Sequence, residues 1–250
     1  MIKFFRKIRQ NLLMENKTSK YFKYAIGEII LVVIGILIAL QINIWNEERK
    51  GLIKEKETLY KFLQDLKSDS TYYQINFKRI LSIDSLHKEL YLVGFEGKQS
   101  LDHSTPNYIR RSLVYNPIAR ENDPNITNKI DNDKIREEIQ IYFRSMSSVA
   151  EAQLEHESIV YKIRDYLRKN RIHNVQKWFK SEMLTAANSE ITIHIIEEPS
   201  LIALSKNEDF QQLLFESSVK INETKQSMTQ HILDNTRLMS KIKDYINNND

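Results

Sequence analysis

The sequence lacks cysteine and has little glycine or proline. The missing cysteines exclude disulfide bonds, thiolate catalysis and thiolate metal sites. Five glycines and four prolines in 250 residues leave few tight turns, so long helices are favoured over a fold of many short strands. Neither a GxxxxGK[ST] nor a GxGxxG motif occurs. The sequence therefore shows no recognisable phosphate-binding loop.

Charge is unevenly distributed along the chain, although the net charge is only +4. Residues 1–24 carry seven basic residues against Glu15, a net of +6, whereas residues 46–250 carry 30 basic residues against 31 acidic ones. The basic excess thus lies just before an apolar run. A nucleic-acid-binding protein would more often carry its basic residues as a patch on the folded domain. We therefore expect a membrane segment and no nucleic-acid partner.

The apolar run is long enough to cross a membrane. Residues 25–45, AIGEIILVVIGILIALQINIW, would form a helix of about 31 Å against a bilayer core of about 30 Å. Thirteen Ile, Leu and Val residues favour insertion by about 6 kcal/mol, more than the cost of about 3 kcal/mol for a charge at mid-bilayer. A cleaved signal peptide is the main alternative, but no small-x-small cleavage site follows the run.

The flanking charges predict the orientation of this span. Basic residues precede it, whereas NEERKGLIKEKE after it mixes both signs. The positive-inside rule therefore places residues 1–24 in the cytoplasm and residues 46–250 outside, which in a bacterium is the periplasm. The head either lies as an amphipathic helix on the inner leaflet or serves only as an orientation signal. In the first case its membrane-surface residues are Lys3, Arg6, Lys7 and Arg9.

One stripe of the span carries small and polar side chains. Small residues allow two helices to approach closely, and polar ones can hydrogen-bond between helices inside a bilayer. We therefore predict an interface with a second copy or with another inner-membrane protein. Alternatively, the carboxylate of the stripe reaches the inner headgroups and the small residues are incidental. The stripe consists of Glu28, Val32, Gly35, Ala39 and Asn43.

The part after the span is predicted to be all-α, as an elongated antiparallel helical bundle. Apolar residues recur at helical spacings over most of it, whereas 98–131 is loop-like and contains three of the four prolines. Asp131 or Asn132 is the expected N-cap of one long helix. The run EITIHIIEEPS is read as an extended connector. The expected helices are 46–93, a short one at 107–115, one opening at 132, one at 174–187 and one at 207–247.

The N-terminal block resembles a known family. FFRKIRQNLL, YAIGEIILVVIGILIALQIN and WNE, within residues 1–66, are similar to the signature of uncharacterised single-pass membrane proteins of Bacteroidetes-type bacteria. IDNDKIREEIQIYF at 130–143 resembles a helix opening of the same family. Where relatives often carry a Ser-Ser-Gly turn, this chain reads SLVYNPIARENDPN. The resemblance implies an inner-membrane protein and supplies no catalytic residues.

No motif for catalysis or for cofactor or metal binding is recognisable. HExxH does not occur, and the six histidines are scattered. We therefore expect no enzyme activity, no cofactor and no metal site. The leading hypothesis is a membrane-anchored periplasmic interaction or scaffolding module. The alternative is a ligand-sensing domain that signals through a membrane partner, since 24 cytoplasmic residues contain no output domain.

Overall fold

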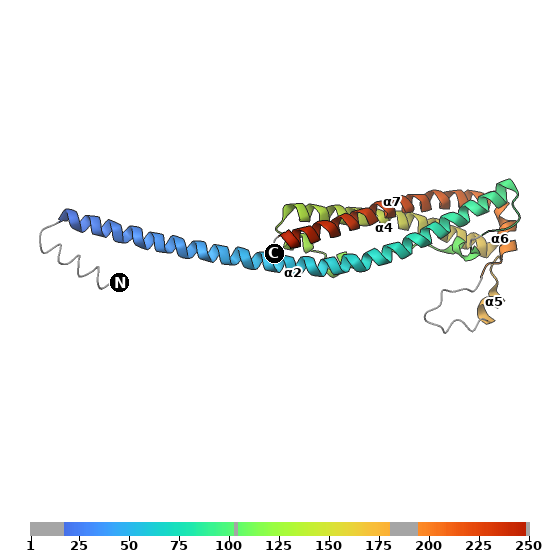
Figure 1. The fold of residues 1–250 in the computed structure, drawn as a ribbon. Helices are drawn as coiled ribbons and strands as arrows, with labels where there is room; N and C mark the ends of the chain where they lie inside the picture. The colour runs from blue at the N-terminus through green and yellow to red at the C-terminus, as the bar shows by residue number, and fades with distance from the viewer. Residues whose placement is uncertain (1–17, 103–104, 181–194, 249–250) are drawn as a thin grey trace. The chain divides into compact units, whose positions relative to one another are not determined.

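The computed structural model describes residues 18–102, 105–180 and 195–248. The chain divides into two units, Met1–Glu57 and Thr58–Asp250. Helix α2 (Thr18–Glu96) begins in the first unit and ends in the second (Figure 1). The described residues are helical or irregular apart from one isolated β-bridge, so the prediction of an all-helical chain is confirmed.

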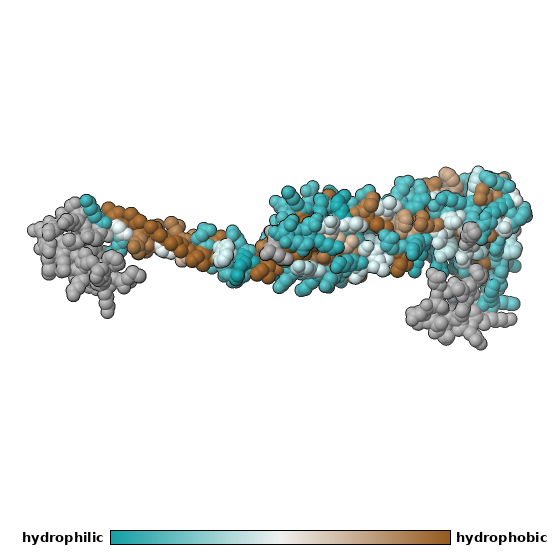
Figure 2. Space-filling view, viewed as in Figure 1, coloured by the Kyte–Doolittle hydropathy of each residue, from teal (hydrophilic) through white to brown (hydrophobic). Residues whose placement is uncertain are grey.

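In the first unit, the described chain is the N-terminal part of α2. Its apolar side chains between residues 26 and 45 are exposed, and Figure 2 shows them as a hydrophobic surface. The helix is long and apolar enough to span a membrane, with a mean hydropathy of 2.6 in its most apolar window and no residue of that window buried. The predicted membrane helix at 25–45 therefore lies in a helix of suitable length and composition.

The end of α2 agrees with the sequence prediction. Gly97 has φ +76°, a left-handed conformation that glycine adopts at little cost. The Lys98 N–H donates to the Leu92 carbonyl across this turn (3.2 Å). A side chain at Gly94 would lie 2.4 Å from the Ser205 backbone oxygen, so glycine also permits close approach here.

The second unit packs three long helices around an apolar core. They are α2 from Thr58 onward, α4 (Asp133–Lys169) and α7 (Glu208–Asn248). The α4 N-cap is Asn132, as predicted, and its side-chain oxygen accepts from the Ile135 N–H (3.0 Å). Five α2 residues are spaced seven apart in the sequence. Leu59, Leu66, Tyr73 and Ile80 are fully buried, whereas Leu52, which lies in the first unit, is only half-buried.

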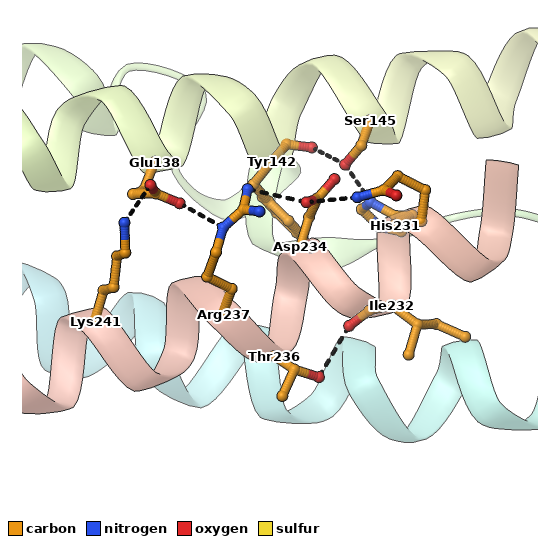
Figure 3. A network of polar contacts seen from close by, with 10 residues as sticks. Glu138, Tyr142, Ser145, His231, Ile232, Asp234, Thr236, Arg237 and Lys241 are labelled. Carbon is orange, nitrogen blue, oxygen red and sulfur yellow. Dashed lines mark hydrogen bonds and ion pairs between the residues drawn. The ribbon is translucent and has the colours of Figure 1, made fainter.

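Polar contacts show how α4 and α7 pair. Glu138 near the start of α4 accepts from Arg237 (2.9 Å) and Lys241 (2.5 Å) near the end of α7 (Figure 3). Tyr166 near the end of α4 donates to Asn207, which directly precedes α7 (2.7 Å). Positions that rise along α4 therefore pair with positions that fall along α7, so the two helices run in opposite directions.

The segment between α2 and α4 differs from the expected single helix at 107–115. The structure has a 3₁₀ turn η1 (Pro106–Arg110), a short helix α3 (Ile118–Asn122) and a second 3₁₀ turn η2 (Ile126–Lys129). Only 106–110 is helical in the region predicted, and that as 3₁₀ rather than α. The chain after it is held by Tyr72 of α2, whose hydroxyl donates to the Val114 carbonyl (2.6 Å).

Helix α3 is capped by a residue distant in sequence. The buried Asp69 carboxylate accepts from the N–H groups of Ile118 (2.8 Å) and Ala119 (2.9 Å). Pro117 at the N-cap position of α3 makes no side-chain hydrogen bond of its own. A cap supplied by another helix leaves no local sequence signal, which explains why α3 was not predicted.

The segment after α4 also corrects a prediction. Helix α5 (Val175–Lys180) covers the start of the predicted helix 174–187, whose remainder lies outside the described residues. The prediction of an extended connector is wrong from Glu198 onward, where helix α6 (Glu198–Ser205) begins. A proline lies in the first turn of this helix. Before it, Ile196 forms an isolated antiparallel bridge with His173.

Candidate functional site

The predicted membrane stripe lies on α2 of the first unit. Val32, Gly35, Ala39 and Asn43 are exposed, and Glu28 is half-buried. A Cβ added at Gly35 would meet no atom within 4 Å. The described residues thus leave the stripe open along most of its length. The predicted membrane-surface residues Lys3, Arg6, Lys7 and Arg9 lie outside the described residues.

In the second unit, a cavity of about 940 Å³ brings together arginine side chains from two segments. Arg110 comes from the end of η1 and Arg111 follows it directly. Arg164 and Arg168 lie one turn apart on α4, so they share a face of that helix. Another part of the cavity wall is apolar and aromatic, and most of it comes from α5. Its residues are Val175, Trp178, Phe179 and Ile195.

Asp165 also lines this cavity, but in the described part of the chain most of the positive charge there has no acidic partner. Arg168 pairs with Asp165 (2.6 Å). Within the described residues, no carboxylate forms an ion pair with Arg110, Arg111 or Arg164. Arg164 instead donates through Nε to the Arg110 carbonyl (2.8 Å). Burial, together with the neighbouring Arg164 charge, lowers the pKa of the Arg110 guanidinium.

His173 adds a further polar group to the same cavity. Its Nε2 is buried and has no hydrogen-bond partner within the described residues. Burial and the nearby Arg110 charge lower the pKa of His173, which favours the neutral ring. Three guanidinium groups that have no acidic partner in the described part of the chain therefore line one space that an anion would suit.

A second polar group is buried between α2, α4 and α7. Ser217 Oγ lies 3.2 Å from His87 Nε2 and 3.4 Å from His156 Nε2. Burial, and for His87 also the neighbouring His156, lowers the pKa to about 3 for His87 and about 4 for His156. General bases work best with a pKa near the operating pH, so these rings are weak bases at pH 7. This group is better explained as packing than as catalysis.

A third buried group surrounds His231 of α7. Its Nδ1 lies 2.8 Å from Ser145 Oγ (Figure 3). Its Nε2 lies 2.9 Å from the Tyr115 hydroxyl. The Tyr73 and Tyr142 hydroxyls are 2.7 Å apart beside it. Burial lowers the pKa of His231 to about 4, so the ring is neutral at pH 7 and both nitrogens have partners. Such satisfied contacts fix the register of the three helices.

Sequence reasoning missed all three groups. The available signals were weak: the Arg110–Arg111 doublet and the spacing of Arg164 and Arg168 on one helix face. The doublet and Arg164 are about fifty residues apart, and only the fold brings them together. Within the described residues, no three His, Asp or Glu side chains are grouped so that they could hold a metal ion.

Comparison with known proteins gives one partial match. Residues 28–101 match the model of a family described as a family of unknown function, DUF6090. The match covers most of the apolar segment and runs just past the end of α2. No curated protein and no solved structure matches the chain. The resemblance to an uncharacterised family is thus confirmed in its coarser form, and arguments about function rest on the geometry described above.

Proposed function

We propose that the protein is a single-pass bacterial inner-membrane protein that serves as an interaction or scaffolding module. Its residues 1–24 lie in the cytoplasm and residues 46–250 form an elongated antiparallel bundle in the periplasm. The observation that carries the proposal is the apolar helix with an exposed stripe of small and polar residues. Such a helix needs a bilayer, and its stripe suits a second helix. The partner is a second copy or another inner-membrane protein.

Association through the stripe is tested with the full chain, fused at its N-terminus to the halves of a split cytoplasmic reporter. Gly35→Ile places a branched side chain where two backbones should meet, and we expect association to fall about tenfold, or about 1.4 kcal/mol. Glu28→Gln should weaken it only two- to threefold, because polar contacts between membrane helices average about 0.6 kcal/mol.

Ile36→Leu is the matched control, since it changes the neighbouring face and keeps the hydropathy. It should leave association unchanged. The comparison is made for pairs of this chain and for pairs with a library of membrane proteins. Equal association of Gly35→Ile and Ile36→Leu against every partner would show that the stripe is no interface.

A ligand-sensing role is the second candidate function. The specific observation in its favour is the cavity beside Arg110 and Arg164, whose volume of about 940 Å³ is within the usual range for small-molecule sites. In this role the Glu28 stripe would engage a membrane partner that receives the signal. The two candidates are therefore compatible.

A further inference from the structure

The cavity beside η1, α4 and α5 concentrates positive charge that the described part of the chain neutralises only in part, through Asp165 of its lining. Within the described residues, Arg110, Arg111 and Arg164 have no acidic partner, although the usual arrangement for a partly buried charge is pairing. Arg110 and Arg164 also lie close enough for their charges to repel. An arrangement of like charges around a space of this volume is stabilised when an anion occupies it.

We propose that this cavity binds an organic phosphate monoester with an apolar or aromatic body. The guanidinium fork matches two phosphate oxygens at once, and a phosphate monoester dianion would neutralise two of the three unpaired arginines. This inference names the ligand class for the second candidate function and does not depend on association in the membrane.

The rest of the cavity indicates what the phosphate is attached to. A phosphate ion alone would fill a small part of about 940 Å³. Val175, Trp178 and Phe179 of α5 supply an apolar and aromatic wall. Aromatic rings hold flat or apolar groups, so the ligand should carry such a group next to its charge. A soluble aromatic phosphate and a phosphate with an aliphatic chain share this chemistry.

Tryptophan fluorescence gives a direct measurement because the chain has only two tryptophans. In the Trp45→Phe background, Trp178 in the cavity is the single reporter. The full chain in detergent micelles is titrated with phenyl phosphate, hexyl phosphate and inorganic phosphate. We expect saturable fluorescence changes with the two esters, and at least tenfold weaker binding of inorganic phosphate. The ester that binds more tightly shows whether the ligand carries an aromatic or an aliphatic group next to its phosphate.

Single substitutions measure how much each arginine contributes to ligand binding. In the same background, Arg164→Gln should weaken binding of the tighter ester about tenfold or more, since a hydrogen bond to a charged group contributes about 1.5–3 kcal/mol. Arg111→Gln should do the same, and it leaves intact the Arg164 contact to the Arg110 carbonyl. Arg144→Gln, an exposed position on α4 outside the cavity, is the matched control and should bind normally.

Circular dichroism shows whether each variant keeps its helices, and Arg111→Gln keeps the test decisive if Arg164→Gln does not. The proposal is overturned if neither ester binds at millimolar concentration. It is equally overturned if folded Arg111→Gln and Arg144→Gln bind alike, or if inorganic phosphate binds as tightly as the esters. None of these results bears on association through the membrane stripe, which the split reporter measures separately.

Discussion

Helix α2 uses the same residue types in two opposite ways. In the first unit, Ile29, Leu31 and Ile36 are 63%, 60% and 62% exposed. In the second unit, Leu66 and Ile80 of the same helix are fully buried. The difference lies in the pattern: the first stretch is apolar around the whole helix, whereas the second is apolar along one stripe. A helix that is apolar all round is stable only with an apolar surrounding, which in this unit the bilayer would supply.

The two regions also differ in where their polar side chains lie and in what these side chains contact. The second unit buries three histidines, and partners from neighbouring helices satisfy part of their hydrogen-bonding capacity. The first unit holds Glu28 in the apolar run, and apart from this residue no charged side chain lies between residues 25 and 45. Polar residues in the second unit therefore serve the fold of this chain, whereas Val32, Gly35, Ala39 and Asn43 of the stripe are exposed.

The largest expected effect is a difference in thiol labelling between positions proposed to lie on opposite sides of the membrane. A position should either be labelled or not labelled. Single cysteines in this cysteine-free chain report exposure to an impermeant thiol reagent on intact spheroplasts. Ser148→Cys, at an exposed position of α4, should react, because residues 46–250 are proposed to lie in the periplasm. Ser19→Cys should react only after the membrane is opened. The opposite labelling pattern would reverse the proposed topology.

The next largest effect is a loss of stability at acidic pH, which we expect only in the second unit because it buries three histidines. Burial lowers the pKa to about 3 for His87, where the neighbouring His156 adds to the effect, and to about 4 for His156 and His231. An unfolded histidine titrates near 6.5, so the unfolded state binds more protons below that pH. Stability is therefore full above about pH 6.5 and is lost as the pH falls towards 4. Between pH 7.5 and 5 each histidine should contribute a loss of about 2 kcal/mol, or about 6 kcal/mol together.

Chemical unfolding of the full chain in micelles, followed by circular dichroism, measures this loss. His231→Gln is the informative variant, because the amide can still hydrogen-bond to the surrounding hydroxyls and does not titrate. It should lose about 2 kcal/mol less than the native chain between pH 7.5 and 5. Asp69, whose pKa burial raises, has the opposite pH dependence, but it is present in both proteins and cancels in the difference. An identical pH dependence would contradict the burial of a neutral His231.

The smallest effect compares one substitution in both regions. Leu66→Ala removes a fully buried side chain and should lower the free energy of unfolding by about 3 kcal/mol, through lost transfer energy and a residual cavity. Leu37→Ala makes the same change at a side chain that is 57% exposed in the first unit. It should leave the unfolding of the second unit unchanged. Similar losses for the two variants would show that the apolar segment of α2 and the helices of the second unit unfold together.

Several features of the fold follow from local signals. The apolar period predicted the three long helices, Asn132 supplied the α4 cap from its own side chain, and Gly97 adopts the left-handed turn at the end of α2. Helix α6 was missed because its apolar residues follow a run that reads as a strand. Helix α3 was missed because Asp69, about fifty residues earlier, provides its cap.

The sequence by itself determined the three long helices and a segment long and apolar enough to span a membrane, because hydrophobic period and helix caps act between neighbouring residues. Which side chains share a buried space was decided only by the tertiary structure. Arg110 and Arg164 meet because η1 packs against the face of α4 that carries Arg164, where Nε of one bonds to the carbonyl of the other. The repulsion between these two charges leaves no signal in the sequence around either residue. It arises only when packing brings two distant segments together, which is why the candidate anion site could not be found without the fold.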